Sequence, residues 1–214
     1  MPQPSHFVIA VDGPAASGKG TIARALAAHF GLPHMDTGLL YRAVALNLLR
    51  RGLDPDSEFA ALRACDGVAG LMGDEELRSE TVGGIASRIS TYPGVRAALL
   101  ERQRDFAAQA GGAVLDGRDI GTVIAPQATA KLFVTASAQV RAERRLAELQ
   151  GREVSAHLAD VLLDIEARDE RDSHRSAAPL RQAADAILLD TSKLDRDESV
   201  AAAIRLVEER LAAV

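Results

Sequence analysis

A glycine-rich segment near the N-terminus holds the residue types and spacing that best fit a chemical role. It reads Gly13-Pro14-Ala15-Ala16-Ser17-Gly18-Lys19-Gly20-Thr21. Small residues let the backbone wrap closely round phosphate groups, so that successive N–H groups point inward. Lys19 can then reach the terminal phosphates, and the Thr21 hydroxyl is placed to meet a magnesium ion, directly or through water. The segment therefore predicts a loop that binds a nucleoside triphosphate with Mg²⁺.

The elements on either side of this loop are those that a phosphate-binding loop requires. Phe7 to Val11 is an apolar run rich in β-branched residues, which predicts a buried strand. After the loop, Ile22, Leu26 and Phe30 repeat at helical spacing, and Gly31 stands where the helix would end. A helix N-terminus at the loop adds a favourable potential for an anion. A glycine-rich turn with a purely structural role is the alternative, and the lysine in this setting argues against it.

Arginines supply a second group of candidate anion ligands. They stand near the ends of expected elements or in a stretch rich in both arginine and acid, at Arg42, Arg118, Arg168, Arg171 and Arg175. The planar guanidinium group binds phosphate oxygens in pairs, so such a set can offset the repulsion between two polyanions. For any one of the last three, the alternative is a solvated helix-surface charge paired with a neighbouring acid, Asp169, Glu170 or Asp172. For the set as a whole, phosphate binding is the stronger interpretation.

The remaining apolar patterns alternate between short strands and longer helices. Three further apolar runs predict strands, at 113–115, 132–135 and 186–189. Helical patterns cover 37–51, 95–110, 138–150 (with Ser137 as a candidate cap), 157–168 and a final helix with Val200, Ile204, Val207 and Leu211 on one face. This alternation predicts an α/β fold with a parallel sheet covered on both sides. Residues 54–92 and 147–175 fit the scheme poorly and are interpreted as appendages on the core.

Composition limits the class of protein. The 214 residues suffice for one sizeable core with small appendages, and 47% hydrophobic and 26% charged residues are ordinary for a folded protein. A net charge of −5 gives no reason to expect nucleic-acid binding. No apolar run approaches the roughly 18 residues of a membrane span, and Met1 to His6 lacks a signal-peptide pattern. A lone cysteine, Cys65, and scattered histidines predict neither a disulfide nor a zinc site, which fits a reducing cytoplasm.

Several motifs, in order along the chain, resemble those of one family. The lysine of the glycine-rich loop is followed by Gly20 and only then by Thr21, a form similar to that of nucleoside monophosphate kinases. The other motifs are Asp36-Thr37-Gly38-Leu39-Leu40-Tyr41-Arg42, Ala86-Ser87 with Tyr92-Pro93-Gly94-Val95-Arg96, Asp116-Gly117-Arg118-Asp119-Ile120-Gly121-Thr122-Val123, and Arg168-Asp169-Glu170-Arg171-Asp172-Ser173-His174-Arg175. With Asp190-Thr191 they extend over almost the whole chain. In this combination the sequence resembles the bacterial cytidylate kinase family.

The resemblance implies a P-loop kinase fold, with a five-stranded parallel sheet flanked by helices and a second strand that leads into Asp36. The core would comprise residues 1–53, 93–146 and 170–214. Residues 54–92 would form a monophosphate-binding insert, and residues 147–169 a short lid. Members of the family commonly carry a longer insert with a small antiparallel sheet, whereas 65–77 is short and shows no clear strand alternation. The insert is therefore expected to be shortened.

The resemblance also implies an activity and the residues that perform it. The activity is phosphoryl transfer from ATP to CMP or dCMP, with Mg²⁺, in the pyrimidine metabolism of the cytoplasm, by a monomer. Lys19, Arg168 and Arg171 would be catalytic, and residues 13–21 would bind ATP. The CMP phosphate would be held by Arg42, Arg118 and Arg175, the sugar by Tyr41, Arg168 and Asp172, and the cytosine by Ser87, Arg96, Asp119 and Thr37. Arg171, with Arg144 and Arg145, would steady the ATP phosphates as the lid closes.

The choice of cytosine also has a physical argument. Cytosine presents an amino donor beside two acceptors, so an ionised Asp119 can accept from the amino group while Arg96 donates to the acceptors. Uracil carries a carbonyl in place of the amino group and would leave the buried acid facing an acceptor. We therefore expect CMP and dCMP to be better substrates than UMP.

Other assignments stay open at this point. Asp116, at the end of an apolar strand, is either a weak candidate for the magnesium shell or an acid in a strand-terminal turn.

A kinase of another small acceptor, such as adenylate or shikimate, is a second interpretation, and a hydroxyl acceptor would need a base such as Asp36 or Asp119. A nucleotide-binding switch protein would leave Ser87, Arg96 and the arginine cluster without a purpose. A kinase that binds its substrates without turnover is the last alternative.

Overall fold

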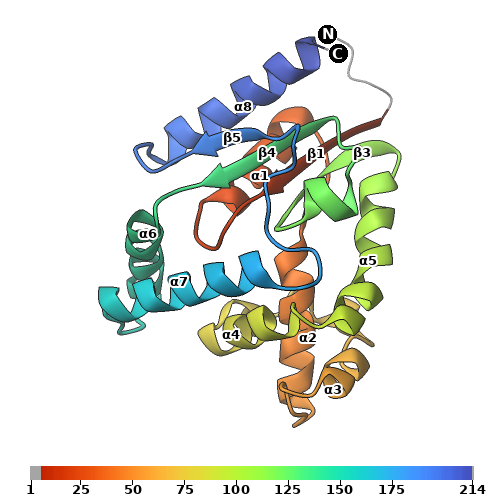
Figure 1. Cartoon of the computed structure of the whole chain (residues 1–214), viewed down its shortest axis with the longest axis vertical. Coiled ribbons are helices and arrows are strands. Elements are labelled where there is room, and N and C mark those ends of the chain that lie inside the picture. The colour runs from red at the N-terminus through yellow and green to blue at the C-terminus, as the bar shows by residue number, and fades with distance from the viewer. Residues whose placement is uncertain (1–5, 214) are drawn as a thin grey trace.

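Five short parallel strands form the sheet on which the rest of the structure is arranged. The computed structural model describes residues 6–213, and its strands lie in the order β2-β3-β1-β4-β5 (Figure 1). They are β1 His6–Asp12, β2 His34–Asp36, β3 Gly111–Gly117, β4 Ala130–Thr135 and β5 Ile187–Asp190. Every neighbouring pair is parallel. The carboxyl ends of the strands therefore meet at one edge, where open α/β sheets bind their ligands.

Helices make up the remaining regular structure of the described residues. The α-helices are α1 Lys19–Phe30, α2 Thr37–Arg50, α3 Glu58–Arg63, α4 Glu80–Ile89, α5 Pro93–Ala108, α6 Ala138–Gln150, α7 Leu158–His174 and α8 Arg196–Ala212. Short turns are the 3₁₀ segments η1 Val68–Leu71 and η2 Glu75–Arg78, and the π-helical η3 Ile120–Ile124. In Figure 1, α8 and α5 lie beside the sheet, α2, α3 and α4 extend away from it, and α7 crosses between these two parts.

Strand β1 is buried on both faces. Its odd-numbered side chains, Phe7, Ile9 and Val11, pack with residues of α1 and α8. Its even-numbered side chains, Val8 and Ala10, pack with residues of η3 and α5. A strand with two buried faces carries apolar residues at every position, which explains why the sequence shows an unbroken apolar run there.

The segment 54–92 contains only helical elements and packs on α2. Asp36 caps α2 by accepting a hydrogen bond from the Gly38 N–H at 2.9 Å. Helix α2 then buries Leu40 and Leu48 in a cluster shared with α3, α4 and α5. This cluster is separate from the two that cover the sheet, so the segment has its own support on α2.

The sequence predicted these elements well except at their ends. The α/β class, the five-stranded parallel sheet and the flanking helices are confirmed. Strand β3 is longer than the predicted run 113–115, because Gly111 and Gly112 also pair with β1. The helix predicted over 157–168 continues to His174, so its predicted end was wrong. No glycine or proline interrupts this charged stretch, and the proposed boundary between lid and core at residue 170 lies inside α7.

Three features of the sequence concern a signal peptide, membrane spans and the single thiol. Of the segment Met1 to His6, in which the sequence shows no signal-peptide pattern, residues 1–5 lie outside the described residues. Within residues 6–213, every helix is too short or too polar to span a bilayer. Burial raises the pKa of the half-buried Cys65 thiol to about 11. Since the thiolate is the reactive form, this burial disfavours reaction of Cys65 as a nucleophile at neutral pH.

Two adjacent glycines at the start of β3 provide a test of the fold. Gly111 and Gly112 both have positive φ angles, of 84° and 97°. A Cβ atom on Gly112 would lie 1.9 Å from the Phe7 carbonyl oxygen, whereas one on Gly111 would have no atom within 4 Å. We expect Gly111→Ala to lower the free energy of unfolding by about 1 kcal/mol through backbone strain. Gly112→Ala should lower it by a further ~2 kcal/mol or more, since backbone atoms must move.

Urea unfolding of both variants and the wild type measures these differences. Gly111→Ala is the control for the positive φ angle. Equal losses in the two variants would contradict the close approach of β1 to Gly112.

Candidate functional site

The glycine-rich loop joins the end of β1 to the start of α1. A Cβ atom on Gly13 would lie 2.0 Å from the Val134 carbonyl oxygen, so β4 approaches the loop too closely for a side chain. Gly18 adopts a left-handed conformation (φ 87°) as the N-cap of α1 and provides no side-chain cap. The Ser17 hydroxyl is buried and has no hydrogen-bond partner within the described structure. The first N–H groups of α1 lie at the end of this loop and can bind an anion.

Lys19, the first residue of α1, folds back over the loop. Its Nζ atom donates to the Pro14 carbonyl oxygen at 3.2 Å. Burial, with the neighbouring Arg118, lowers the pKa of Lys19 to about 8. An ammonium group whose charge is disfavoured in this way is stabilised by an anionic partner. The position of Lys19 therefore suits a phosphate group.

One cavity connects this loop with the residues predicted to bind the second substrate. Its volume is about 320 Å³. The predicted site residues that line it are Ala15, Ala16, Ser17, Gly18, Lys19, Gly20, Thr21, Thr37, Tyr41, Arg42, Ser87, Arg96, Asp116, Arg118, Asp119, Arg145, Arg168, Asp172 and Arg175. Gly13, Pro14, Arg144 and Arg171 are not among the lining residues. Motifs from separate parts of the sequence are thus brought together round one space.

Two arginines of the cavity are held by carbonyl oxygens. Arg42 Nη1 donates to the carbonyls of Leu77 and Ser79 at 2.7 and 3.2 Å. Arg168 Nη2 donates to the Gly83 carbonyl at 2.8 Å, and its Nη1 lies 3.9 Å from the exposed Asp164 carboxylate. Burial lowers the pKa of both guanidinium groups, to about 10 for Arg42, to which the nearby Arg168 also contributes. Positive charge that is compensated so incompletely favours a bound anion.

Three other arginines are paired with buried carboxylates. Arg118 Nε donates to Asp172 Oδ2 at 2.7 Å. Arg96 Nη2 contacts Asp119 Oδ2, and Arg175 Nη2 lies 3.4 Å from Asp119 Oδ1. The Asp119 side chain is 7% exposed, and burial raises its pKa although the neighbouring arginines oppose this shift. The Asp119 carboxylate, an acceptor, and the Arg96 guanidinium, a donor, therefore lie side by side in the cavity. Such buried groups discriminate strongly between ligands that pair with them and ligands that do not.

The Arg96–Asp119 pair has Tyr41 beside it, and two further predicted residues, Ser87 and Arg171, contact each other. The Arg96 guanidinium carbon is 5.9 Å from the centroid of the Tyr41 ring. Arg171 Nε donates to Ser87 Oγ at 3.3 Å, so its contact is with α4 of the 54–92 segment. The role predicted for Arg171 at the ATP phosphates stays a prediction.

Asp116 ends β3 beside the phosphate loop and is held by a histidine. His34 Nε2 lies 2.7 Å from Asp116 Oδ1, and the Thr37 hydroxyl donates to the Asp116 carbonyl at 2.9 Å. Burial, together with Asp116, raises the pKa of the neighbouring Asp36. Among residues 6–213 there is no group of three or more His, Cys, Asp or Glu that would bind a metal unaided. A hydrated Mg²⁺ that takes most ligands from water and phosphate needs only one or two protein oxygens, which Thr21 and Asp116 can offer.

Sequence reasoning missed some of the residues that organise this site. Arg141 of α6 is buried, pairs with Asp169 of α7, and donates from Nη1 to the Ala15 carbonyl of the phosphate loop at 3.3 Å. Arg144 was named from the sequence, for the ATP phosphates, but its contacts were not: it donates to the hydroxyl and the carbonyl of Thr191 at 3.0 and 2.7 Å, and its role at ATP stays a prediction. No local pattern marks such contacts, because the partners are far apart in the sequence.

A second hollow lies on the other side of the phosphate loop. Its volume is about 360 Å³, and it shares Ala16, Ser17, Gly18, Thr21 and Glu148 with the first cavity. Its other lining residues are Ile22, Arg144, Leu194, Asp195, Arg196 and Ser199. The phosphate loop thus separates two spaces, each within the size range of small-molecule sites.

Known structures with a similar fold include kinases. A shikimate kinase from Bacteroides thetaiotaomicron has a TM-score of 0.50 at 15% identity, over 95% of this chain and 97% of that one. An uncharacterized protein from Eubacterium ventriosum has a TM-score of 0.57 at 15% identity, over 95% and 99%. At this level of identity, the likeness shows a common fold alone.

Sequence comparisons are more specific. Cytidylate kinases of Xanthobacter autotrophicus and Rhodopseudomonas palustris are 59% and 57% identical to this chain. The matches cover 96% and 94% of this chain, and 99% and 96% of the relatives. A family model described as cytidylate kinase matches residues 9–209. The chain therefore belongs to the cytidylate kinase family.

Proposed function

We propose that this chain transfers the γ-phosphoryl group of ATP to CMP or dCMP, giving ADP with CDP or dCDP, as a step of pyrimidine nucleotide metabolism. The observation that carries the proposal is the cavity that joins Lys19 and the phosphate loop to the Arg96–Asp119 pair. Arg42, Arg118 and other guanidinium groups line the space between these ends. Two polyanions can meet there because this positive charge offsets their repulsion.

ATP would place its phosphates on the loop formed by residues 13–21. Lys19 would contact the terminal phosphates, and the N–H groups at the start of α1 would bind phosphate oxygens. The adenosine would extend into the second hollow, which begins at the loop and is bounded by Arg144 and Leu194. Mg²⁺ would be held near Thr21 and Asp116 and would neutralise part of the phosphate charge when bound.

CMP would lie with its phosphate toward the loop and its base at Asp119. Arg42 is the strongest candidate for a contact near the phosphate, because its present hydrogen-bond partners are neutral carbonyls. Arg168, which donates to the Gly83 carbonyl and lies 3.9 Å from Asp164, is a second candidate. The other residues expected around CMP, namely Thr37, Tyr41, Ser87, Arg96, Arg118, Asp119, Asp172 and Arg175, line the same cavity. The cytosine amino group would donate to Asp119, and Arg96 would donate to the base.

The reaction needs no general base, because the attacking atom is an anionic oxygen of the CMP phosphate. A bond forms from this oxygen to the γ-phosphorus of ATP, and the bond from that phosphorus to the oxygen bridging to the β-phosphate breaks. Lys19, Arg168 and Arg171 would stabilise the charge on the transferring group and on the leaving ADP. The contribution of the chain is therefore alignment and charge compensation.

Contacts with the proposed insert would close the site. From the proposed lid, Arg152 Nη1 donates to the Arg78 carbonyl at 3.0 Å, and from α6, just before the lid, Arg145 pairs with Glu80 of α4. The Arg168 contact with Gly83 joins α7 to α4 in the same way. Closure would exclude water, which competes as a phosphoryl acceptor.

Alternative functions have weaker support. A hydroxyl acceptor such as shikimate would need a general base, and the Asp119 carboxylate is engaged by two arginines. A nucleotide switch without a second substrate would leave the Arg96–Asp119 end of the cavity without a ligand. A monomeric state and a cytoplasmic location stay predictions from the sequence.

A panel of nucleoside monophosphates tests the proposed acceptor. With ATP and Mg²⁺, kcat/KM should be at least about tenfold higher for CMP and dCMP than for UMP, because UMP places a carbonyl against Asp119. AMP should also be a poor acceptor. A coupled assay of ADP release measures these rates. Higher kcat/KM for UMP or AMP than for CMP would refute the assignment.

Replacement of Lys19 tests the phosphate loop. We expect Lys19→Ala to lower kcat by about 10²- to 10³-fold, since it removes a charge that stabilises the transition state. The fold should persist, because the burial of Lys19 disfavours its charge in the free protein. Lys193→Ala, at an exposed position, is the matched control. Turnover near that of the wild type in Lys19→Ala, with a normal melting temperature, would contradict the assignment.

Replacement of Arg96 tests the base site. Arg96→Met should mainly raise the KM for CMP, by about tenfold, and reduce the preference for CMP over UMP, because a buried charge-assisted donor is lost. Arg102→Met, at an exposed position of the same helix α5, is the control. Steady-state kinetics with both acceptors provides the measurement. An unchanged CMP/UMP ratio would remove Arg96 from base recognition.

A further inference from the structure

The turn that follows Asp119 is not capped by Asp119 itself. Asp119 is the N-cap residue of η3, yet its side chain makes no hydrogen bond to that segment. An aspartate at this position ordinarily accepts from the first free N–H groups. Here its carboxylate is engaged by Arg96 and Arg175 instead. The buried N–H groups at the start of η3 therefore need another acceptor.

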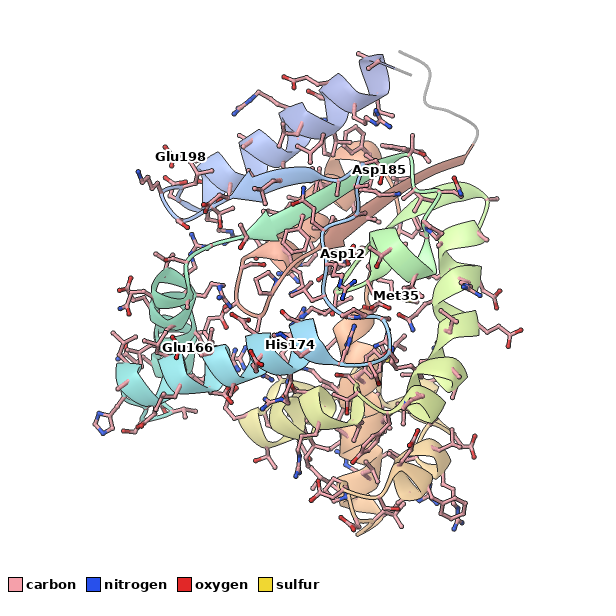
Figure 2. All side chains as sticks on the ribbon, viewed as in Figure 1. Asp12, Met35, Glu166, His174, Asp185 and Glu198 are labelled. Atoms are coloured by element: carbon pink, nitrogen blue, oxygen red, sulfur yellow. The ribbon has the colours of Figure 1, made fainter. Side chains whose placement is uncertain are left out.

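Asp12, the last residue of β1, is that acceptor. Its Oδ1 accepts from the Ile120 N–H at 2.8 Å, and its Oδ2 from the Gly121 N–H at 2.7 Å. The alternation of β1 places the Asp12 side chain on the same face as Val8 and Ala10, the face that η3 covers. Figure 2 shows Asp12 near the centre of the molecule, and the residue is 4% exposed. One carboxylate thus holds two consecutive amides of the turn.

Close packing leaves the turn little freedom to shift. A Cβ atom on Gly121 would lie 3.3 Å from Asp12 Oδ2 and 3.1 Å from Lys131 Cδ. A Cβ atom on Gly117, at the end of β3, would lie 2.8 Å from Ile120 Cδ1. The turn is therefore seated directly against β3 and Asp12. A displacement of the Ile120 amide would move Asp119, because the two residues share a peptide bond.

We propose that Asp12 is a positioning residue for recognition of the acceptor base: by holding the Ile120 and Gly121 amides, it sets where the Asp119 carboxylate meets the nucleotide. The inference rests on the proposed function, because it assigns the base contact to Asp119. Asp12 is not among the residues that line the cavity, so it acts through the turn and not on the substrate. Asp12 also directly precedes the phosphate loop, so the same residue fixes the position of the base site relative to that loop.

The ionisation of Asp12 supports a role other than stability. Burial raises the pKa of Asp12 to about 6, although the two N–H groups and Lys19 lower it, and Asp119 adds to the rise. Because this folded-state pKa lies above the ordinary value of 3.8, stability falls as pH rises from about 4 through 6, so the ionised carboxylate stabilises the fold less than the protonated acid would. Its two hydrogen bonds to the turn give the carboxylate a role in placing Ile120 and Gly121.

The central experiment compares Asp12→Asn with the wild type. The amide keeps the size of the side chain but turns one acceptor into a donor, which then faces a backbone N–H. We expect the KM for CMP to rise about tenfold and the CMP/UMP preference to fall by a similar factor, with the KM for ATP changed less than about twofold. Equal increases in KM for ATP and CMP, or an unchanged CMP/UMP ratio, would overturn the proposal.

Val11→Ala is the control for general weakening of β1. Val11 is buried on the opposite face of the strand, so its truncation destabilises β1 without contact to η3. The assays are run at a temperature equally far below each melting temperature. Val11→Ala should keep the KM for CMP and the CMP/UMP ratio of the wild type. A loss of preference equal to that of Asp12→Asn would show that Asp12 acts only through stability.

A second measurement does not depend on the folding of that variant. In the wild-type protein, amide exchange measured by NMR should be as slow for Ile120 and Gly121 as for the interior of β1. Rapid exchange of both amides would overturn the proposal. If Asp12→Asn does not fold, Asp12→Ser, whose hydroxyl can accept one of the two bonds, is assayed in its place, with the same expected direction and the same overturning result.

These results separate the inference from the function on which it rests. A wild-type enzyme with no preference for CMP over UMP would refute the proposed function itself. A wild-type enzyme that shows this preference, with an Asp12→Asn variant that keeps it, would refute the role of Asp12 alone.

Discussion

The concentration of positive charge in one cavity of an acidic protein is the constraint on which the site depends. The chain carries a net charge of −5, yet Arg42 meets the cavity with carbonyl oxygens as its partners, and Arg168 with a carbonyl oxygen and, 3.9 Å away, the Asp164 carboxylate. A guanidinium group held by carbonyls is positioned without being neutralised, whereas Arg118 is neutralised in part by Asp172. Burial lowers the pKa of both Arg42 and Arg168, which means that their charge is costly until an anion arrives. A nucleotide phosphate is the kind of anion that would complete this charge balance.

The parallel sheet places the two halves of the site next to each other. Strand β1 ends in the phosphate loop, β3 ends in the turn with Arg118 and Asp119, and the register pairs Asp12 with Gly117. The loop and the turn are therefore neighbours because their strands are neighbours, as expected at the carboxyl edge of such a sheet. The Asp12 carboxylate reinforces this proximity with two hydrogen bonds across the junction.

The proposed insert and the segment that includes α6 and α7 meet around the same charges. Arg145, Arg152 and Arg168 come from that segment, and each lowers the pKa of Arg42, which stands on α2. Like charges brought together in this way repel one another unless an anion such as a phosphate lies between them. The contacts of Arg145 with Glu80, and of Arg168 with Gly83, hold these elements together without removing that repulsion. Under the proposed function, substrate binding would therefore favour the approach of these elements.

Sequence alone determined the fold class and the phosphate loop, because each depends on local patterns, and the resemblance to one family named most of the residues that line the cavity. A buried strand followed by a glycine-rich loop, a lysine and a helix has one common structural solution. The sequence alone could not determine which distant residues form hydrogen bonds or ion pairs with one another. Residues distant in the chain are joined by the ion pair of Arg141 with Asp169, by the contact of His34 with Asp116, and by the hydrogen bond from the Ile120 N–H to Asp12. Such contacts depend on strand register and on which faces are covered, and these are settled only when the whole core packs.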